Sequence, residues 1–288
     1  MQSSSKSTAP SPVKPADGDG ASPDRGGAAA FFDLDKTLMA GSSGMVFARV
    51  AGRRGFVTRR QLARWGRDHL RYRLRGSTDE QTKAILDVAK RIFAEIPERD
   101  VERMAPEILA GILPRIYPQM LAEIHRHQDE GRATFIVSAA GNDLVKALAA
   151  VLGMEGGIGT RWAVGTDGKY TGEMEGPFVY GKGKVEAMTR FAERHEIDMD
   201  ASYAYSDSVS DLPMLRSVGH AVVVNPDADL LVIARQEGWG VMRFERLGRK
   251  LAIAGATALA AAFGGAAASA SRRRNARRLG AGRRSLRR

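Results

Sequence analysis

Short apolar runs alternate with amphipathic stretches through the second half of the chain. Buried strands are predicted over residues 133–138, 202–205 and 221–224. Before, between and after them, apolar residues recur at the spacing of a helix. The helices are predicted at residues 119–129, 142–152, 184–194, 212–218 and 228–236. This alternation predicts an α/β protein with a parallel sheet and helices on both of its faces.

An earlier apolar run, residues 28–34, predicts the first strand of that sheet. A long helical stretch follows it, from Met45 to about Tyr117. Within this stretch, arginines recur at helical spacing and form a basic stripe made of Arg60, Arg64, Arg67, Arg71 and Arg75. A helical insertion is therefore expected directly after the first strand.

The pattern changes between Gly157 and Val179, where two short extended runs flank the sequence GTDGK. The pair Asp167-Gly168 is typical of a tight hairpin turn, because both central positions of such a turn need an unusual backbone conformation. A hairpin is predicted here, between two of the helices of the α/β pattern.

Aspartates follow two of the predicted strands. Asp33 and Asp35 end the first apolar run, and Asp207 and Asp211 follow the run at residues 202–205. The carboxyl ends of parallel strands meet at one edge of the sheet, so the four acids are expected to lie together. A buried carboxylate is costly without a cation nearby, and hard oxygen ligands suit Mg²⁺. The acids therefore predict a magnesium site.

Four motifs occur in a fixed order along the chain. They are the sequence DLDKT with Asp33, a strand that ends in Ser138, the sequence GKGKVEAM with Lys184, and the pair Asp207 and Asp211. Together they resemble the haloacid dehalogenase superfamily of phosphohydrolases, and within it the phosphoserine-phosphatase-like subgroup. The resemblance covers residues 28–243. It implies a Rossmann-like parallel sheet core with a helical cap domain inserted after the first strand.

The resemblance implies a phosphomonoester hydrolase with two catalytic aspartates. Asp33 would attack the phosphorus atom and form an aspartyl phosphate, a mixed anhydride that water then opens. Asp35 would protonate the leaving alkoxide and later deprotonate the water. Mg²⁺ would be held by Asp33, by the backbone carbonyl of Asp35 and by Asp207, with Asp211 reaching it directly or through water.

Three further residues would bind the phosphate group or support the loop around it. Lys184 would offset charge between the phosphoryl group and the nucleophile, Ser138 would donate to a phosphoryl oxygen, and Thr37 would steady the loop. Other interpretations stay open at this point. Ser138 could cap a helix, as could Asp211, and Lys182 competes with Lys184 for the same role.

The expected substrate is a small phosphorylated metabolite such as O-phosphoserine, because residues 175–184 resemble the hairpin-to-lysine segment of phosphoserine phosphatases. Three departures weaken the match. Ser42 stands near the glutamate that usually receives the serine ammonium group, SDSVSD replaces GDGxND, and SAAG replaces SGG. The amino-acid pocket is therefore less well indicated than the phosphatase chemistry.

The predicted organisation has four parts. Residues 1–27 form a disordered lead-in, residues 28–41 with 118–245 the α/β core, residues 42–117 the helical cap, and residues 246–288 an alanine-rich segment with an arginine-rich tail. The lead-in lacks the apolar core of a signal peptide. There are no cysteines, which excludes a disulfide framework and fits a reducing compartment, so a cytoplasmic location is expected.

The net charge of +11 is unevenly distributed. The tail from Ser271 to Arg288 has nine arginines and no acid, and residues 49–75 carry a net charge of +9, which leaves −7 for the remainder. An acidic body argues against specific nucleic-acid binding by the whole protein. His125, His127 and His195 lie in polar stretches and are expected to be solvated.

Residues 251–270 contain no charge and are about long enough to span a bilayer, with basic residues on both sides. The alternative function is therefore a membrane-associated phosphatase of a lipid-linked or lysophospholipid monoester, bound to an anionic membrane surface through this segment. An alanine-rich helix or a disordered tail explains the segment equally well. A non-enzymatic adaptor with an arginine-rich tail is a third hypothesis.

Overall fold

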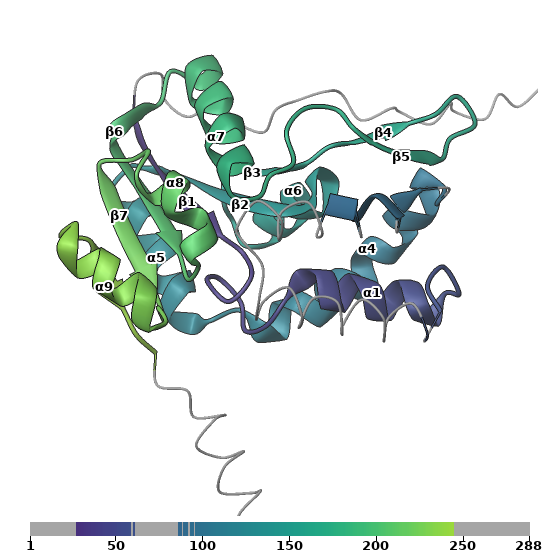
Figure 1. Cartoon of the computed structure of the whole chain (residues 1–288), viewed down its shortest axis with the longest axis horizontal. Coiled ribbons are helices and arrows are strands. Elements are labelled where there is room, and N and C mark those ends of the chain that lie inside the picture. Colours follow the sequence, from purple (N-terminus) through teal and green to yellow (C-terminus); the bar gives the residue numbers. More distant parts are fainter. Residues whose placement is uncertain are drawn as a thin grey trace, which may run out of the picture. The chain divides into compact units, whose positions relative to one another are not determined.

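The computed structural model describes residues 27–58, 60, 86–87, 89–91, 93–94 and 96–244. In this part of the chain six strands form a parallel sheet in the order β3-β2-β1-β6-β7-β8 (Figure 1). The predicted parallel sheet is confirmed. The strands are β1 Ala28–Asp33, β2 Ala133–Gly141, β3 Gly156–Thr160, β6 Asp198–Ser206, β7 His220–Val224 and β8 Gly240–Met242.

Helices cover both faces of the sheet, and the alternation of side chains along β1 decides which face each one meets. Phe31 belongs to a buried cluster with Met188 of α7 and with residues of α8 and α9. The next residue, Phe32, points to the opposite face and meets His127 of α5. Figure 1 shows α5 and α7 on opposite sides of the strands. The helices are α5 Pro118–Asp129, α6 Asn142–Val151, α7 Lys182–His195, α8 Leu212–Leu215 and α9 Ala228–Gln236.

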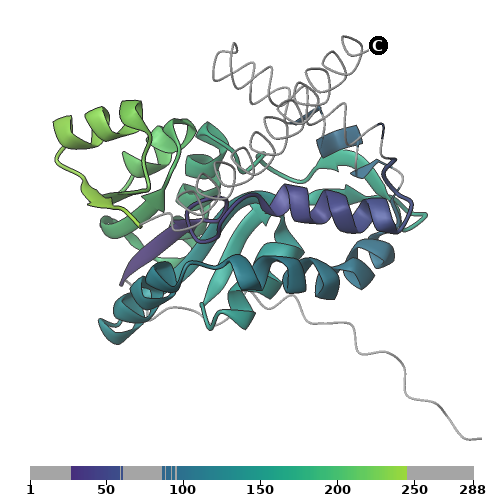
Figure 2. The same ribbon diagram turned by 90° about the horizontal axis from the view of Figure 1, so that it is seen from below.

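Two helices occupy the chain between β1 and β2. They are α1, Ser43–Arg53, and α4, Glu98–Ile112, which lie side by side in both views (Figures 1 and 2). Gly111 permits this contact, because a Cβ atom there would lie 2.6 Å from Cγ1 of Val46. The helical insertion after the first strand is confirmed, and its exact limits stay a prediction.

The insertion is not one unbroken helical stretch. Residues 54–57 form turns and bends after α1, which interrupts the helix predicted from Met45 to Tyr117. A short 3₁₀ helix, Leu113–Arg115, follows α4 and leads toward α5. Of the predicted basic stripe, the described residues contain Arg60 alone, so the stripe lies otherwise outside them.

The predicted hairpin is present but smaller than expected. Strands β4, Trp162–Val164, and β5, Tyr170–Met174, pair in antiparallel fashion around a turn in which Gly168 has φ +74°. The first extended run of the predicted hairpin region instead joins the main sheet as β3, where Ile136 of β2 pairs with Gly157. Glycine at position 157 is required there, since a Cβ atom would lie 2.6 Å from a side-chain carbon of Val145.

The predicted lead-in at residues 1–27 lies outside the described part, apart from Gly27, and so do residues 246–288. Among the described helices, none is long and apolar enough to cross a membrane. The uncharged segment at residues 251–270 is not covered by that finding.

Candidate active site

The sheet register brings the motif residues to one edge. Asp33, the last residue of β1, pairs with Val137 of β2, so that Ser138 is the next residue on the neighbouring strand. On the other side, Phe32 pairs with Tyr205 of β6, and Asp207 follows directly after that strand. The strands β1, β2 and β6 therefore end at the same edge of the sheet, and the motif residues at their ends lie together there.

A buried lysine from α7 joins two of the aspartates. Nζ of Lys184 donates to Oδ1 of Asp33 at 2.5 Å and to Oδ2 of Asp211 at 2.6 Å. Lys184 is 2% exposed, whereas Lys182 is exposed. Of the two lysines that compete in the sequence, the structure brings Lys184 to the aspartates.

The glycine between these lysines allows α7 to start close to the preceding loop. A Cβ atom at Gly183 would lie 1.9 Å from the backbone oxygen of Phe178. Any larger residue would displace the first turn of α7, and with it Lys184. The sequence GKGK is thus explained by packing as well as by charge.

Burial and repulsion between carboxylates oppose the ionisation of Asp33 and Asp207. Burial raises the pKa of Asp33 to about 7, against the opposing charge of Lys184. The neighbouring carboxylates of Asp211 and Asp207 add to that rise. Burial likewise raises the pKa of Asp207 to about 6. Burial opposes the charge on Lys184, but Asp211 and Asp33 together outweigh it and hold the pKa of this lysine above its ordinary value.

Lys36 is a second cation at the site that the sequence analysis did not assign. Its Nζ lies 3.9 Å from Oδ2 of Asp207, and its backbone adopts φ +60° in the loop after β1. The sequence offered one signal for it, its place inside the motif DLDKT. When all four aspartates are ionised, Lys36 and Lys184 leave an excess of two negative charges at the site.

This excess and the carboxylate oxygens fit a divalent cation such as Mg²⁺. The carboxylate oxygens are suitable ligands for this ion, but they are not arranged around a single point. Among the described residues, no three acidic or histidine side chains converge on one point. Lys184 lies between Asp33 and Asp211 instead, and Oδ2 of Asp211 also accepts from Ser206 Oγ at 2.7 Å. The role of Asp211 at a metal stays a prediction.

Asp35 is held by the start of the first inserted helix. Oγ of Ser42 donates to Oδ2 of Asp35 at 2.7 Å, and the backbone N–H of Ser43 donates to Oδ1 at 2.8 Å. The helix N-terminus favours such a carboxylate, because its first N–H groups have no partners within the helix. Ser42 is the N-cap residue of α1, and its side chain binds Asp35 instead of a backbone N–H group of the helix.

Ser138 and Thr37 lie at the same edge and are buried. Oγ of Ser138 accepts from the backbone N–H of Ala140 at 3.2 Å, a local turn that leaves its own proton free to donate elsewhere. Thr37 Oγ1 is buried without a hydrogen-bond partner among the described residues. Both placements are compatible with the predicted phosphate-binding roles, which stay predictions.

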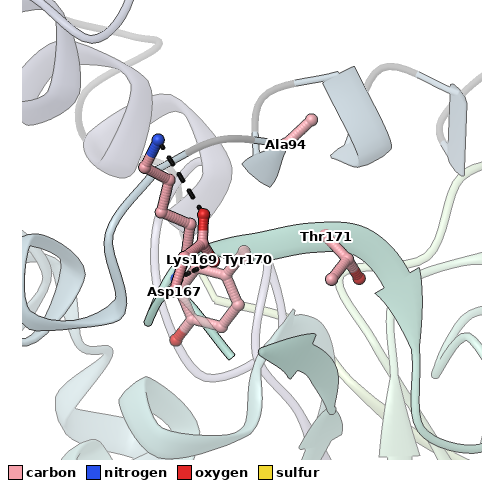
Figure 3. A pocket seen from close by; sticks show the side chains of 5 residues that line it. All are labelled: Ala94, Asp167, Lys169, Tyr170 and Thr171. Carbon is pink, nitrogen blue, oxygen red and sulfur yellow. Dashed lines mark hydrogen bonds and ion pairs between the residues drawn. The ribbon is translucent and has the colours of Figure 1, made fainter. Parts of the chain in front are cut away.

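A separate cavity of about 510 Å³ lies on the hairpin (Figure 3). Figure 3 shows Lys169 and Asp167 paired at its wall, with Nζ of the lysine 3.9 Å from Oδ2 of the aspartate. Its other lining residues are Ala94, Tyr170 and Thr171. None of the predicted site residues lines this cavity.

The residues at the carboxyl ends of the strands limit the chemistry that this site can perform. A parallel sheet presents a buried aspartate, a lysine bonded to it and further carboxylates at the carboxyl ends of its strands. This arrangement suits a hydrolase that attacks an anionic substrate with a carboxylate.

Comparison with known proteins identifies the family. The haloacid dehalogenase-like hydrolase family matches residues 30–216. The phosphoserine phosphatase SerB1 of Mycobacterium tuberculosis is 35% identical over 278 residues, which cover 92% of this chain and 87% of that protein. A histidinol-phosphatase of Neisseria meningitidis is 30% identical over 220 residues, covering 75% of this chain and 98% of that protein.

A solved structure described as a phospho-aspartyl intermediate analogue of phosphoserine phosphatase shares the fold. Its TM-score is 0.55 at 19% identity, and the match covers 79% of this chain and 98% of that one. The chain belongs to the haloacid dehalogenase-like hydrolase family, and within it the protein is an enzyme of the phosphatase type.

Proposed function

We propose that the protein is a magnesium-dependent phosphomonoester hydrolase that acts through a phosphorylated Asp33. The observation that carries the proposal is the pair of short hydrogen bonds from Lys184 to Asp33 and Asp211. A buried ammonium group bonded to a carboxylate at a strand end orients that carboxylate for attack. It also offsets the charge that gathers when an anionic phosphate approaches.

In the proposed reaction, Asp33 is first phosphorylated and then released by water. In the first, an oxygen of Asp33 forms a bond to phosphorus while the ester P–O bond breaks, and the leaving alkoxide takes a proton from Asp35. In the second, water attacks the same phosphorus and gives a proton to Asp35. The bond from Asp33 to phosphorus then breaks, which releases inorganic phosphate and restores the carboxylate.

Mg²⁺ would be held by Asp33, by the backbone carbonyl of Asp35 and by Asp207, with Asp211 adding a ligand directly or through water. When bound, it would supply charge neutralisation for the phosphoryl oxygens. Ser138 and Thr37 would complete the phosphate site by donating hydrogen bonds.

The substrate proposed first is a small phosphorylated metabolite, with O-phosphoserine as the leading example. SerB1 is named a phosphoserine phosphatase, and a second relative is named a histidinol-phosphatase. The substrates that these two names denote are small phosphomonoesters that carry an amino group. Ser42 bonds to Asp35 instead of standing free for an ammonium group, so any such group would be received elsewhere.

A phosphate-release screen tests this proposal. The enzyme is assayed with Mg²⁺ against phosphorylated metabolites that include O-phosphoserine and histidinol phosphate, a lysophospholipid and p-nitrophenyl phosphate, with Asp33→Asn as the blank. Release from a small metabolite, abolished in the variant, supports the proposal. Release from the lysophospholipid alone would shift the assignment to a membrane-linked monoester.

The membrane-associated alternative is favoured by one observation, the uncharged segment at residues 251–270 with arginines after it. Flotation with anionic liposomes, with and without residues 246–288, tests it. Binding that depends on this segment supports the alternative, and equal recovery in the unbound fraction removes it. The adaptor hypothesis has no such support, because the chain belongs to a hydrolase family and keeps all the motif aspartates and Lys184.

Replacing Ser42 with alanine is expected to lower kcat by about 10-fold with little change in KM, because Asp35 loses one of the two hydrogen bonds that orient it. Ser43→Ala is the matched control. Ser43 holds Asp35 through its backbone, which the substitution keeps. Equal rates for the two variants would show that Ser42 does not orient the acid.

A further inference from the structure

The prediction that His127 is solvated is wrong. The side chain is 0% exposed and lies between α5 and the sheet. His127 follows Ile124 by three residues and Met120 by seven, which places it on the buried stripe of α5. A buried imidazole needs partners for both ring nitrogens, and it finds them in polar groups that the mechanism above does not use.

The hydrogen bonds of His127 indicate which of its two ring nitrogens carries the proton. Nε of Arg132 lies 2.8 Å from Nδ1 of His127, and because an arginine can only donate, Nδ1 carries no proton. A neutral ring then carries its proton on Nε2, which lies 2.7 Å from the Tyr205 hydroxyl, its acceptor in this tautomer, and 3.1 Å from Nη2 of Arg126. That hydroxyl donates in turn to Oε1 of Glu123 at 2.5 Å. We call the chain His127, Tyr205 and Glu123 the relay.

A second arginine, Arg126, binds the carboxylate of Glu123 at the other end of the relay. Arg126 donates to Glu123 through two nitrogens, at 2.6 and 3.2 Å. The hydroxyl of Tyr205 is thus held by Glu123, by His127 and, at 3.3 Å, by Nη2 of Arg126, which favours a single position for its ring.

The relay reaches the active site through two adjacent strands. The ring of Tyr205 stacks on Phe32 with centroids 4.5 Å apart and an interplanar angle of 8°, and the two residues are register partners. Phe32 directly precedes Asp33. Tyr205 is followed by Ser206, which donates to Asp211, and then by Asp207. The stacked rings of Phe32 and Tyr205 therefore hold the two strands just ahead of Asp33 in the sequence and just ahead of Asp207 and Asp211.

We propose that Tyr205 and His127 are positioning residues for phosphate hydrolysis, which hold the ends of β1 and β6 so that Asp33 and Asp207 keep their relative placement. The proposal rests on the proposed function of those aspartates. Its physical basis is the sensitivity of catalysis to geometry, since a displacement of about 1 Å can cost roughly 100-fold in rate. The relay acts from the face of the sheet opposite to α7, so it constrains the strands without touching the substrate.

Burial and two neighbouring arginines keep His127 neutral, against the opposing charge of Glu123. On α5 it faces Glu123 and Arg126, in the following turn Arg132, and on β6 the rings of Tyr203 and Tyr205. Burial, then the two arginines, lower the pKa of His127 to about 4. A histidine pKa lowered on folding contributes stability above its unfolded pKa of about 6.5, and this contribution is lost as the pH falls toward 4.

The first test is Tyr205→Phe, which keeps the stacked ring and removes the hydroxyl. Tyr203→Phe is the matched control, because Tyr203 lies on the same strand and its hydroxyl is not part of the relay. Both are assayed on p-nitrophenyl phosphate with Mg²⁺, well below their melting temperatures. We expect kcat of Tyr205→Phe to fall about 10-fold with KM within about twofold, and Tyr203→Phe to match the wild type.

Equal kcat values for the two variants would overturn the proposal. A wild-type enzyme without activity on any phosphomonoester would instead refute the proposed function, so the two failures are distinguishable. ¹⁵N NMR of the histidine side chains gives a reading that does not depend on the variants' stability, with the His127 signal assigned by its loss in His127→Gln. At pH 7 a neutral His127 with its proton on Nε2 is expected, and a charged ring or a proton on Nδ1 would overturn the relay.

Discussion

Replacing Asp33 with asparagine is expected to reduce phosphate release by at least about 10³-fold, which is the largest effect that we predict. The amide cannot form the mixed anhydride, and no other carboxylate takes its place. Asp211 is bonded to Lys184 and Ser206, and Asp35 to Ser42 and the backbone of Ser43. The measurement is phosphate release on the best substrate of the screen.

Folding of this variant is checked by its thermal unfolding. The asparagine keeps the shape of the side chain and removes one of three mutually repelling charges, so a melting temperature close to that of the wild type is expected. A folded Asp33→Asn protein with more than about a tenth of the wild-type rate would contradict the assignment of the nucleophile.

Replacing Lys184 with methionine is expected to lower kcat by about 10²- to 10³-fold and to destabilise the protein. The lost ammonium group leaves Asp33 and Asp211 buried without their shared cation, and breaking a buried ion pair in this way costs about 3–5 kcal/mol. The free energy of unfolding and kcat are measured on the same samples.

Lys182→Met is the matched control for this prediction. It removes an equal charge two residues earlier on the same helix, from an exposed position. The control is expected to change kcat less than about twofold and stability by less than about 0.5 kcal/mol. Equal losses in the two variants would show that net charge, and not the contact with Asp33, is what matters.

The sequence predicted the strands and helices that carry strong local patterns. The run at residues 28–34 became β1, and the helix predicted at residues 228–236 has the limits of α9. The run that forms β3 was assigned to the hairpin and β8 was not predicted, because one is rich in glycine and the other has three residues, so their pairing with distant strands decides their structure. The hairpin around Asp167 was predicted because its turn chemistry is local.

All members of the candidate site except Lys36 could be named from the sequence, whereas their contacts could not. The bonds from Lys184 join it to a residue 151 positions earlier and to one 27 positions later, distances that no periodicity encodes. The contact of Ser42 with Asp35 depends on where α1 begins. For His127, local polarity suggested a solvated residue, but the apolar stripe of α5 and its partner Tyr205 bury it.

Trapping the phosphorylated Asp33 would test its proposed role as the nucleophile directly. The variant Asp35→Asn is mixed rapidly with p-nitrophenyl phosphate and Mg²⁺. The p-nitrophenolate group can leave without being protonated, so the first step continues in this variant. The second step is slowed, because the asparagine side chain cannot take a proton from the attacking water. We predict a burst of one p-nitrophenolate per active site, slow turnover afterwards, and a phosphoryl group on Asp33 by mass spectrometry of the acid-quenched protein. An active wild type whose Asp35→Asn variant gives neither a burst nor a phosphorylated Asp33 would contradict the account.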